Sequence, residues 1–257
     1  MQKLKFYKYQ ATGNDFVILD SRQLPGDWDY SELATRICPR RTAIGADGLI
    51  IIETDVAEDF EMKYYNVDGS GPIMCGNGAR ASVQFVYQII EKKEEFQFCT
   101  PDGEHYGKIQ SDKVAITMQN ASEIQHLEDE EHQIFLLNTG VPHIVILHPD
   151  AENIDIAEYA RPLRKKYDAN VNFVYQREPD GWLIRTYERG VEGETLACGT
   201  GVTASALVLT EKFQHDYPVK IEAKGGPLTV DLQGEKLWLI GAAQQVYEGK
   251  IKINELR

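Results

Sequence analysis

One short motif occurs twice in this chain. The first copy begins at Cys75 and reads Cys-Gly-Asn-Gly-Ala-Arg-Ala-Ser-Val, and the second begins at Cys198 and reads Cys-Gly-Thr-Gly-Val-Thr-Ala-Ser-Ala. In each copy a cysteine precedes a glycine-flanked turn, and the apolar residues after the turn predict a helix. A fold for this chain must therefore present two thiols at two helix N-termini, one in each half of the sequence.

Three further segments recur in the same order as the cysteine motif. The matched segments are 12–19 with 139–146, 46–51 with 169–174, and 63–66 with 185–188. Each recurs about 125 residues later, which is far longer than the roughly 20 to 50 residues of a solenoid repeat. The sequence therefore predicts two homologous halves, residues 1–120 and 121–243, with the acidic stretch 123–132 as the linker.

Most of each half shows the alternation that is typical of short β-strands, with turns at 68–69 and 225–227 between them. The helical segments 79–90 and 202–209 are apolar around much of their circumference, which predicts buried rather than amphipathic helices. We expect an α+β fold with two pseudo-symmetric halves. Each half would be a mostly antiparallel, β-barrel-like sheet wrapped around a central buried helix, with the active site in the cleft between the halves.

The composition excludes several classes of protein. At 257 residues, with 42% hydrophobic and 26% charged residues, the chain is long enough for two modest cores. The net charge of −13 argues against binding to nucleic acid, which requires a basic surface. The chain shows neither a signal-peptide pattern nor an apolar run long enough to cross a bilayer. We therefore expect a cytoplasmic protein without a membrane partner.

The four cysteines are Cys38, Cys75, Cys99 and Cys198. They form no Cys-x-x-Cys motif, and no histidine pair has the spacing of metal ligands, so we expect no metal site. Cys38 and Cys99 lie in apolar stretches, where a cysteine is usually a small buried hydrophobic residue. The two cysteines of the repeated motif are the candidates for chemistry.

Two thiols at helix N-termini suit proton transfer at one carbon atom. The helix dipole favours the thiolate, and the N–H groups at Gly76 and Gly199 can bind a carboxylate. With each sulfur about 3 to 3.5 Å from the neighbouring Cα, the sulfurs would lie roughly 7 Å apart. One thiolate would remove the α-proton while the other thiol delivers a proton, and the N–H groups would stabilise the developing charge. The chain has no evident pyridoxal lysine motif, and we expect no cofactor.

Together these segments resemble the diaminopimelate epimerase family of the cofactor-independent amino-acid racemase superfamily. The matching segments are 13–16, 45–48, 66–70, 74–80, 142–143, 170, 188–190 and 193–201. They cover nearly the whole chain in family order, and the two cysteine segments are the most specific. The resemblance implies interconversion of LL- and meso-diaminopimelate for lysine and peptidoglycan synthesis. It also implies that a C-terminal strand, 244–257, completes the first half.

The resemblance assigns roles to individual residues. Cys75 and Cys198 would alternate as base and acid, with His143 near the first thiol and Glu188 near the second to help ionise or orient them. Arg189 can grip a substrate carboxylate as a bidentate fork, and asparagine amides can pair with ammonium or carboxylate groups. The expected substrate-binding residues are Asn14, Asn66, Gly76, Asn77, Asn170, Glu188, Arg189, Gly199 and Thr200.

Three positions depart from the family pattern. Gly48 stands where some members carry a substrate-contacting Gln, and Val141 replaces the Asn or Ser that commonly precedes Pro-His. Both changes remove a polar group that could contact substrate. Glu192 resembles a one-residue insertion, which a loop can absorb.

Three other functions stay open. A proline or hydroxyproline racemase would share the two thiols, but that family typically has His after the first Cys-Gly, where this chain has Asn77. Cys75 and His143 could instead form a hydrolase dyad, which would leave the second cysteine motif without a role. The third alternative is a non-catalytic binding protein. The expected partner is a small amino-acid substrate, and a homodimer is one open arrangement.

The paired thiols also predict sensitivity to oxidation. Two readily ionised thiols could form a disulfide once their Cα atoms come within about 7 Å. Oxidant should then lower activity and remove both titratable thiols together.

Overall fold

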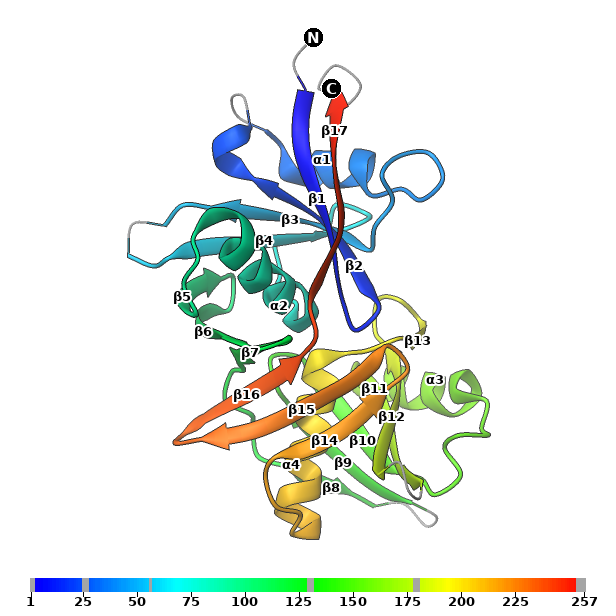
Figure 1. Ribbon diagram of the computed structural model, residues 1–257. Helices are drawn as coiled ribbons and strands as arrows, with labels where there is room; N and C mark the ends of the chain where they lie inside the picture. Colours follow the sequence, from blue (N-terminus) through cyan, green and yellow to red (C-terminus); the bar gives the residue numbers. More distant parts are fainter. Residues whose placement is uncertain (1–2, 25–27, 56, 129–131, 178–180, 253–257) are drawn as a thin grey trace. The chain divides into compact units, whose positions relative to one another are not determined.

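The computed structural model describes residues 3–24, 28–55, 57–128, 132–177 and 181–252 (Figure 1). The chain divides into two compact units. Unit 1 comprises Met1–Ile116 and Ala242–Arg257, and unit 2 comprises Thr117–Gly241. Each unit has its own strands and its own central helix.

Unit 1 begins with an antiparallel hairpin of β1 (Lys3–Ala11) and β2 (Asn14–Asp20). Thr12 and Gly13 form its turn, and both have positive φ, at 48° and 83°. The remaining elements are η1 (Ser21–Gln23), α1 (Tyr30–Ile37), β3 (Gly48–Glu53), β4 (Phe60–Asn66), α2 (Gly76–Phe85), the π-helical turn η2 (Val86–Ile90), β5 (Glu95–Thr100), β6 (Gly103–Gln110), β7 (Lys113–Thr117) and β17 (Gln244–Lys252).

The strands of unit 1 form a mixed sheet that surrounds α2. Their order is β17–β1–β2–β3–β4–β5–β6–β7, with parallel pairing at β2–β3 and β4–β5 and antiparallel pairing elsewhere. The helix contacts β17, β1 and β2 as well as β6 near the other end of this order. Gly107 on β6 permits this approach, because a Cβ there would lie 2.5 Å from Val83 Cγ2. The sheet therefore curls around the helix, as Figure 1 shows for unit 1.

Unit 2 repeats this plan. Its sheet runs β8–β9–β10–β11–β12–β14–β15–β16, with parallel pairing at β10–β11 and β12–β14, and β13 adds to β12. The central helix α4 contacts β9, β10, β11, β14 and β15. The bounds are β8 (Gln125–Leu127), β9 (Gln133–Asn138), β10 (Pro142–Leu147), α3 (Ile156–Tyr167), β11 (Asn170–Arg177), β12 (Gly181–Glu188), β13 (Gly193–Thr195), α4 (Gly199–Phe213), β14 (Val219–Ala223), β15 (Gly226–Gln233) and β16 (Lys236–Gly241).

The equivalent strands show where the two halves correspond. Phe16 pairs with Gly48 between β2 and β3, and His143 pairs with Asn170 between β10 and β11. Since the equivalent hairpin turns make His143 the counterpart of Phe16, Asn170 corresponds to Gly48. The repeated segments 46–51 and 169–174 match Asn170 with Asp47 instead, and this match is wrong by one residue. The sequence repeat alone does not contain the strand register that gives the correct match.

Each unit also packs a shorter helix against the outside of its sheet. Asp29 caps α1 by accepting a hydrogen bond from a backbone N–H, and Asp155 caps α3 in the same way. Leu33 and Ile37 of α1 belong to one buried apolar cluster, and Ile156 of α3 belongs to another. In contrast, most side chains of α2 and α4 are buried, as their all-round apolar sequence predicts.

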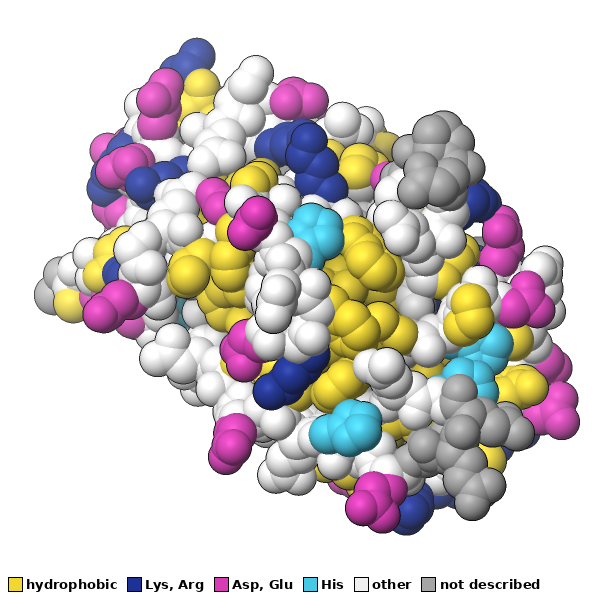
Figure 2. All heavy atoms as spheres, turned by 90° about the horizontal axis from the view of Figure 1, so that it is seen from below, with side chains coloured by type: hydrophobic (Ala, Val, Ile, Leu, Met, Phe, Trp, Pro, Cys, Tyr) yellow, Lys and Arg dark blue, Asp and Glu magenta, His cyan; other side chains and the backbone are white. Residues whose placement is uncertain are grey.

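The predicted α+β class and the pseudo-symmetric, helix-centred halves are confirmed. The predicted linker is partly wrong, because Gln125–Leu127 form β8 and pair with β9. Residues 129–131 of that stretch and residues 253–257 of the predicted final strand lie outside the described residues. On the face in Figure 2, Lys and Arg side chains are interspersed with Asp and Glu around a central group of apolar side chains. No helix in the described ranges has the length and apolar character needed to cross a membrane.

Candidate active site

Cys75 caps the N-terminus of α2. Its backbone is extended (φ −139°, ψ 114°), and its sulfur accepts a hydrogen bond from the Gly78 N–H at 3.4 Å. Gly78 allows a close fit here, since a Cβ at this position would lie 3.3 Å from Ile50 Cδ1. The first N–H groups of a helix lack intrahelical partners and carry the positive end of the helix dipole. The position therefore favours a thiolate and provides a binding site for a carboxylate.

Asn14 and Asn77 lie beside this thiol. The side-chain oxygen of Asn14 accepts a hydrogen bond from Asn77 Nδ2 at 3.3 Å and lies 3.8 Å from the Cys75 sulfur. Asn14 Nδ2 donates to the Asp47 carboxylate at 2.7 Å, which fixes the orientation of the amide because a carboxylate only accepts. Three residues predicted from the sequence thus meet at the first cysteine turn.

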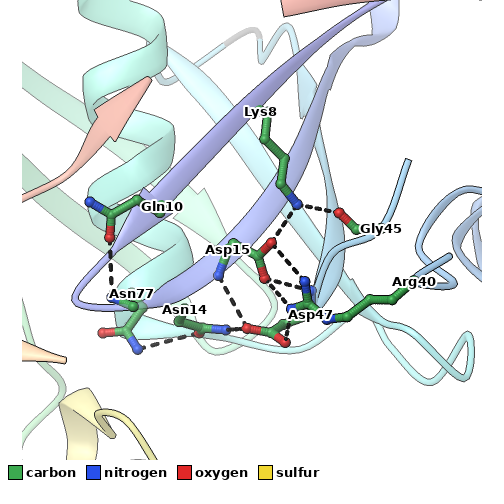
Figure 3. A network of polar contacts seen from close by, with 9 residues as sticks. Lys8, Gln10, Asn14, Asp15, Arg40, Gly45, Asp47 and Asn77 are labelled. Carbon is green, nitrogen blue, oxygen red and sulfur yellow. Dashed lines mark hydrogen bonds and ion pairs between the residues drawn. The ribbon is translucent and has the colours of Figure 1, made fainter. Parts of the chain in front are cut away.

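A charged cluster next to the β1–β2 hairpin holds Asn14 in place (Figure 3). Asp15 pairs with Lys8 at 2.6 Å and with Arg40 at 2.5 Å, and Arg40 also pairs with Asp47 at 2.7 Å. Burial alone would raise the pKa of Asp15, but hydrogen bonds from Arg40 and Lys8 outweigh burial and lower the pKa to about 2. Asp15 therefore stays ionised at neutral pH and retains Arg40, which in turn holds Asp47 against Asn14.

Arg80 follows Cys75 in the first turns of α2 and is fully buried, at 0% exposure. Its guanidinium donates to Asn77 Oδ1 at 2.8 Å, to Thr12 Oγ1 at 2.9 Å and to the Gly76 carbonyl at 3.4 Å. Burial lowers the pKa of Arg80 to about 10, and interaction with Cys75 opposes this shift. The side chain thus remains a cation at neutral pH and ties Asn77 to the hairpin turn.

A directed chain of hydrogen bonds orients Asn66 at the end of β4. The Ser70 hydroxyl donates to the Asp68 carboxylate at 2.6 Å, so the Ser70 oxygen accepts from Asn66 Nδ2 at 2.9 Å. The Tyr64 hydroxyl then donates to Asn66 Oδ1 at 2.9 Å. Hydrogen bonds from Ser70 also lower the pKa of Asp68, which keeps this carboxylate an acceptor. These hydrogen bonds identify which atom of the Asn66 amide is the oxygen and which is the nitrogen.

Tyr64 also explains why residue 48 is a glycine. A Cβ at Gly48 would lie 2.3 Å from Tyr64 Cε2 and 2.5 Å from the Tyr65 carbonyl oxygen. The Tyr64 ring is buried and packs edge-on against Phe16, with ring centroids 5.7 Å apart. The tyrosine thus fills the space beside Gly48, and its hydroxyl supplies a polar group there.

Cys198 caps the N-terminus of α4 in a similar extended conformation, with φ −118° and ψ 111°. Within the described structure its sulfur accepts no capping hydrogen bond from the helix backbone, and the Thr200 hydroxyl lies 3.3 Å from it instead. Gly201 is required at this turn, because a Cβ there would lie 2.2 Å from Asn172 Oδ1. The two cysteine turns therefore share a backbone form but differ in what contacts the sulfur.

The hydrogen bonds of His143 connect it to this second turn. Asn172 Nδ2 donates to the Ile144 carbonyl at 2.9 Å and lies 3.0 Å from His143 Nδ1, so Nδ1 must accept. The proton of the neutral ring is then on Nε2, which donates to Thr200 Oγ1 at 2.9 Å. Burial, helped by the charge of Arg189, lowers the pKa of His143 to about 3. His143 is therefore neutral at physiological pH and orients the hydroxyl that contacts Cys198.

Glu188, Arg189 and Asn170 meet where β11 begins and β12 ends. The Arg189 backbone N–H donates to Asn170 Oδ1 at 2.8 Å, and the Glu188 carboxylate accepts from Thr195 at 2.5 Å. The Arg189 guanidinium pairs with Asp168 at 2.8 Å. Because the Asp168 side chain is 70% exposed, this ion pair is weak, and a substrate carboxylate can compete for the guanidinium.

The turn after Arg189 contains Glu192, the residue that resembles an insertion. Its φ is 55°, its N–H donates to the Glu188 carbonyl at 2.9 Å, and its carboxylate pairs with Arg164 at 2.7 Å. At the other altered position, Val141 contributes its carbonyl oxygen, which accepts from the Thr139 N–H at 3.2 Å. These contacts show that Glu192 is accommodated in a turn without disrupting β12.

Several residues of the site were not predicted as functional from the sequence, among them Asp47, Tyr64, Arg80 and Asn172. Asn172 leaves a visible signal, because it is a polar residue inside an otherwise apolar strand segment and is fully buried. Arg80 leaves a similar signal inside the apolar helix α2. A charged or amide residue at an otherwise buried position requires a partner, and that requirement could have marked both residues.

The family comparison agrees with this duplicated arrangement. The sequence profile described as diaminopimelate epimerase matches residues 6–124 and 135–253, one segment for each half. A diaminopimelate epimerase of Flavobacterium psychrophilum is 38% identical over 260 residues, which cover 96% of this chain and 100% of that protein. One from Campylobacter lari is 40% identical over 248 residues, covering 95% and 98%.

Solved structures with the same fold have more distant sequences. A phenazine biosynthesis protein of the PhzF family from Bacillus anthracis gives a TM-score of 0.77 at 14% identity, covering 98% of this chain and 100% of that one. A hydroxyproline epimerase from Agrobacterium vitis gives 0.71 at 14% identity, covering 98% and 91%. These structures support the fold, whereas the full-length sequence matches identify the family. The chain belongs to the diaminopimelate epimerase family.

Proposed function

We propose that this protein is a cofactor-independent isomerase that interconverts LL- and meso-diaminopimelate by proton transfer between two cysteines and the α-carbon. The observation that carries the proposal is the pair of cysteines that cap α2 and α4 in a chain of this family. The reaction would serve lysine and peptidoglycan synthesis in the cytoplasm, where thiols stay reduced.

The two cysteine turns supply the chemistry. One sulfur, as thiolate, takes the α-proton, the C–H electrons remain on the α-carbon, and the opposite thiol then gives its proton to the other face of that carbon. The helix N–H groups stabilise the charge that develops on the substrate carboxylate. After one turnover the thiolate and the thiol have exchanged places, so the reverse reaction uses the same groups in the opposite order.

Thr200 is suited to this exchange at Cys198. Its oxygen already accepts the His143 Nε2 proton, so its own proton can point to a Cys198 thiolate at 3.3 Å. When Cys198 is a thiol, the same oxygen can accept the S–H proton through its second lone pair. The hydroxyl can therefore serve both protonation states without any movement of the backbone.

The remaining polar groups would bind the second amino-acid end of diaminopimelate. Arg189 offers a guanidinium to the distal carboxylate, and Glu188 is the anionic partner for its ammonium group. The oriented amides of Asn66 and Asn170 would add directional hydrogen bonds. A substrate without a charged distal end would leave these groups without ligands, and this favours diaminopimelate over proline.

The two rival enzymes are less consistent with these residues. Asn77 stands where a proline racemase typically carries His, and its amide is held by Arg80 and Asn14. A Cys-His hydrolase would need a histidine that accepts a proton from its cysteine. His143 instead donates through Nε2, and its Nδ1 is occupied by Asn172.

The deciding experiment incubates the protein in deuterated buffer with LL-diaminopimelate and, separately, with L-proline. We expect meso-diaminopimelate and α-deuterium in the first reaction and no exchange in the second, followed by proton NMR. The Cys75→Ala/Cys198→Ala double variant is the control for background exchange. Deuterium that appeared only in proline would replace the assignment with a proline racemase. Exchange in neither amino acid would favour a binding protein.

A further inference from the structure

Arg80 is a cation inside unit 1 without a carboxylate partner among the described residues. It is 0% exposed, and the acceptors of its hydrogen bonds are a carbonyl, a hydroxyl and an amide oxygen, all neutral. Its Nε also has no acceptor in the described structure. Burying an unpaired charge is costly, and proteins normally pair such a group with an anion. The charge of the buried Arg80 guanidinium is therefore not balanced by any carboxylate among the described residues.

Among the described residues, Cys75 is the ionisable group whose charge acts on Arg80. Both residues lie at the start of α2, and Cys75 is the charged neighbour that offsets the effect of burial on Arg80. Arg80 also holds Asn77, whose amide contacts Asn14 beside the sulfur. The Gly78 N–H points at the same sulfur at 3.4 Å. A thiolate at Cys75 would supply the missing anion.

Charged groups on the strands around α2 do not replace this anion, because their ion pairs already contain a cation. These pairs are Asp15 with Lys8 and Arg40, Asp20 with Arg22, Glu53 and Glu61 with Lys63, and Glu248 with Lys5. Asp102 accepts hydrogen bonds from Thr100 and His105. The tyrosines Tyr9 and Tyr64 donate their hydroxyl protons to Gln88 and Asn66 and remain neutral.

The second copy of the motif has no buried cation at this position. The charge of Arg189 acts on His143 behind the turn, but the Arg189 side chain is 34% exposed and pairs with Asp168. Thr203 occupies the position of Arg80, is fully buried, and donates its hydroxyl to the Gly199 carbonyl at 3.0 Å. The histidine behind this turn is neutral, as its hydrogen bonds and its lowered pKa both require. Cys198 also lacks the backbone N–H bond that Cys75 receives within the described structure. The duplicated turns therefore offer the two thiols unequal support for negative charge.

We propose that Arg80 is the buried counter-cation of the Cys75 thiolate, so that the ligand-free protein holds Cys75 as thiolate and Cys198 as thiol. Arg80 is then a positioning residue that acts through Cys75 and Asn77. The consequence of this charge distribution for catalysis rests on the proposed epimerase function. The isomer whose α-hydrogen faces Cys75 reacts with the resting protein directly, whereas the other isomer requires the proton to move from Cys198 to Cys75 first.

The test measures alkylation of ligand-free protein by iodoacetamide as a function of pH, with peptide mass spectrometry reporting Cys75 and Cys198 separately. The pH midpoint of each curve reports ionisation, and it is less affected than the rate by differences in access. We expect the Cys75 midpoint to lie at least about one pH unit below that of Cys198. Equal midpoints, or a lower midpoint for Cys198, would overturn the proposal.

Two variants at Arg80 separate charge from packing. Arg80→Gln should raise the Cys75 midpoint by about one pH unit or more and leave the Cys198 midpoint unchanged. Arg80→Lys, which keeps the charge, should restore a low midpoint. The matched control, Thr203→Val in the other turn, should not change the Cys75 midpoint. An unchanged Cys75 midpoint in folded Arg80→Gln would contradict the proposal. If that variant does not fold, wild type and Arg80→Lys decide between the same outcomes.

This measurement uses no substrate, so its result is independent of the epimerase assay. A protein with an Arg80-dependent Cys75 thiolate but no exchange of diaminopimelate would refute only the proposed function. A protein that epimerises diaminopimelate with equal thiol midpoints would refute only the role of Arg80.

Discussion

The two cysteine turns have the same backbone design and different chemical surroundings. In the first turn a Cβ at Gly78 would lie 3.3 Å from the apolar Ile50, whereas in the second a Cβ at Gly201 would lie 2.2 Å from Asn172 Oδ1 and 3.3 Å from His143 Cε1. In the first turn the polar support is a buried cation, and in the second it is a chain of neutral hydrogen bonds. After duplication, the glycines and cysteines thus kept the helix-capping geometry, while the residues behind them diverged. In our proposal this divergence stabilises different protonation states of the two thiols.

The sharpest test of this comparison removes each thiol in turn. Cys75→Ala and Cys198→Ala should each lower turnover of diaminopimelate by about 10²- to 10⁴-fold, because each thiol acts as an acid in one direction and a base in the other. Turnover is measured by the conversion of LL- to meso-diaminopimelate. Cys99→Ala, at a half-buried cysteine outside both turns, is the control and should retain activity. Full conversion of diaminopimelate by Cys198→Ala would contradict proton transfer by two cysteines.

The second turn should depend on the amide of Asn172, whereas the equivalent position in the first turn is the apolar Ile50. Asn172→Leu removes the donor to His143 and to the Ile144 carbonyl in a fully buried site, so we expect a loss of about 2 to 3 kcal/mol in the free energy of unfolding. Urea denaturation measures this loss. The exchange Ile50→Val at the equivalent position of unit 1 should cost only about 1 kcal/mol.

Nitrogen NMR of the imidazole ring tests the same contacts directly. In the wild-type protein we expect His143 to carry its proton on Nε2, and in Asn172→Leu we expect this preference to weaken. A wild-type ring protonated on Nδ1 would show that Asn172 does not orient it and that the second turn works differently.

The sequence predicted the shared parts of the two turns better than their differences. Hydrophobic alternation marked the strands, and the cysteine motifs are local, so their helix-capping positions follow from consecutive residues. Arg80 and His143 each have a partner that is distant in sequence: Thr12 lies 68 residues from Arg80, and Asn172 lies 29 residues from His143. Only the tertiary fold brings such residues together.

The same limitation explains the errors at single positions. The match of Asp47 with Asn170 was one residue off because strand register depends on the folded sheet. The stretch around Gln125–Leu127 was predicted as a linker because its polar composition hides a short strand, whose side chains are mostly exposed. The reason for Gly48 likewise appeared only when Tyr64 was placed beside it.

Acid should distinguish the two units. The folded-state pKa of His143, about 3, is far below its ordinary value of 6.5, so the unfolded chain binds a proton more readily between these pH values. The stabilisation is therefore fully present above pH 6.5 and is lost as the pH falls toward 3. At pH 5 we expect unit 2 to lose about 2 kcal/mol from this group.

Hydrogen exchange measured peptide by peptide checks this acid effect in each unit. Protection of unit 2 should fall between pH 6.5 and 5, and His143→Gln should make the change smaller, whereas the exposed His126→Gln should not. Over the same range Asp15, which anchors the cluster next to the first turn, stays ionised because its pKa is about 2. Equal losses of protection in both units would show that protonation of His143 does not destabilise unit 2 selectively.

The smallest expected effect concerns Tyr64, whose hydroxyl orients Asn66 in the first unit. Tyr64→Phe keeps the ring that fills the space beside Gly48 but removes one hydrogen bond of 2.9 Å, which is worth about 1 kcal/mol. Since Asn66 is proposed to bind substrate without taking part in proton transfer, KM for diaminopimelate should rise about fivefold and kcat should change little. Tyr65→Phe, on the next residue of β4, is the matched control and should leave both constants unchanged. A fall in kcat with unchanged KM would mean that Tyr64 acts on the Cys75 turn itself, and Asn66 would then belong with the reaction machinery rather than with substrate binding.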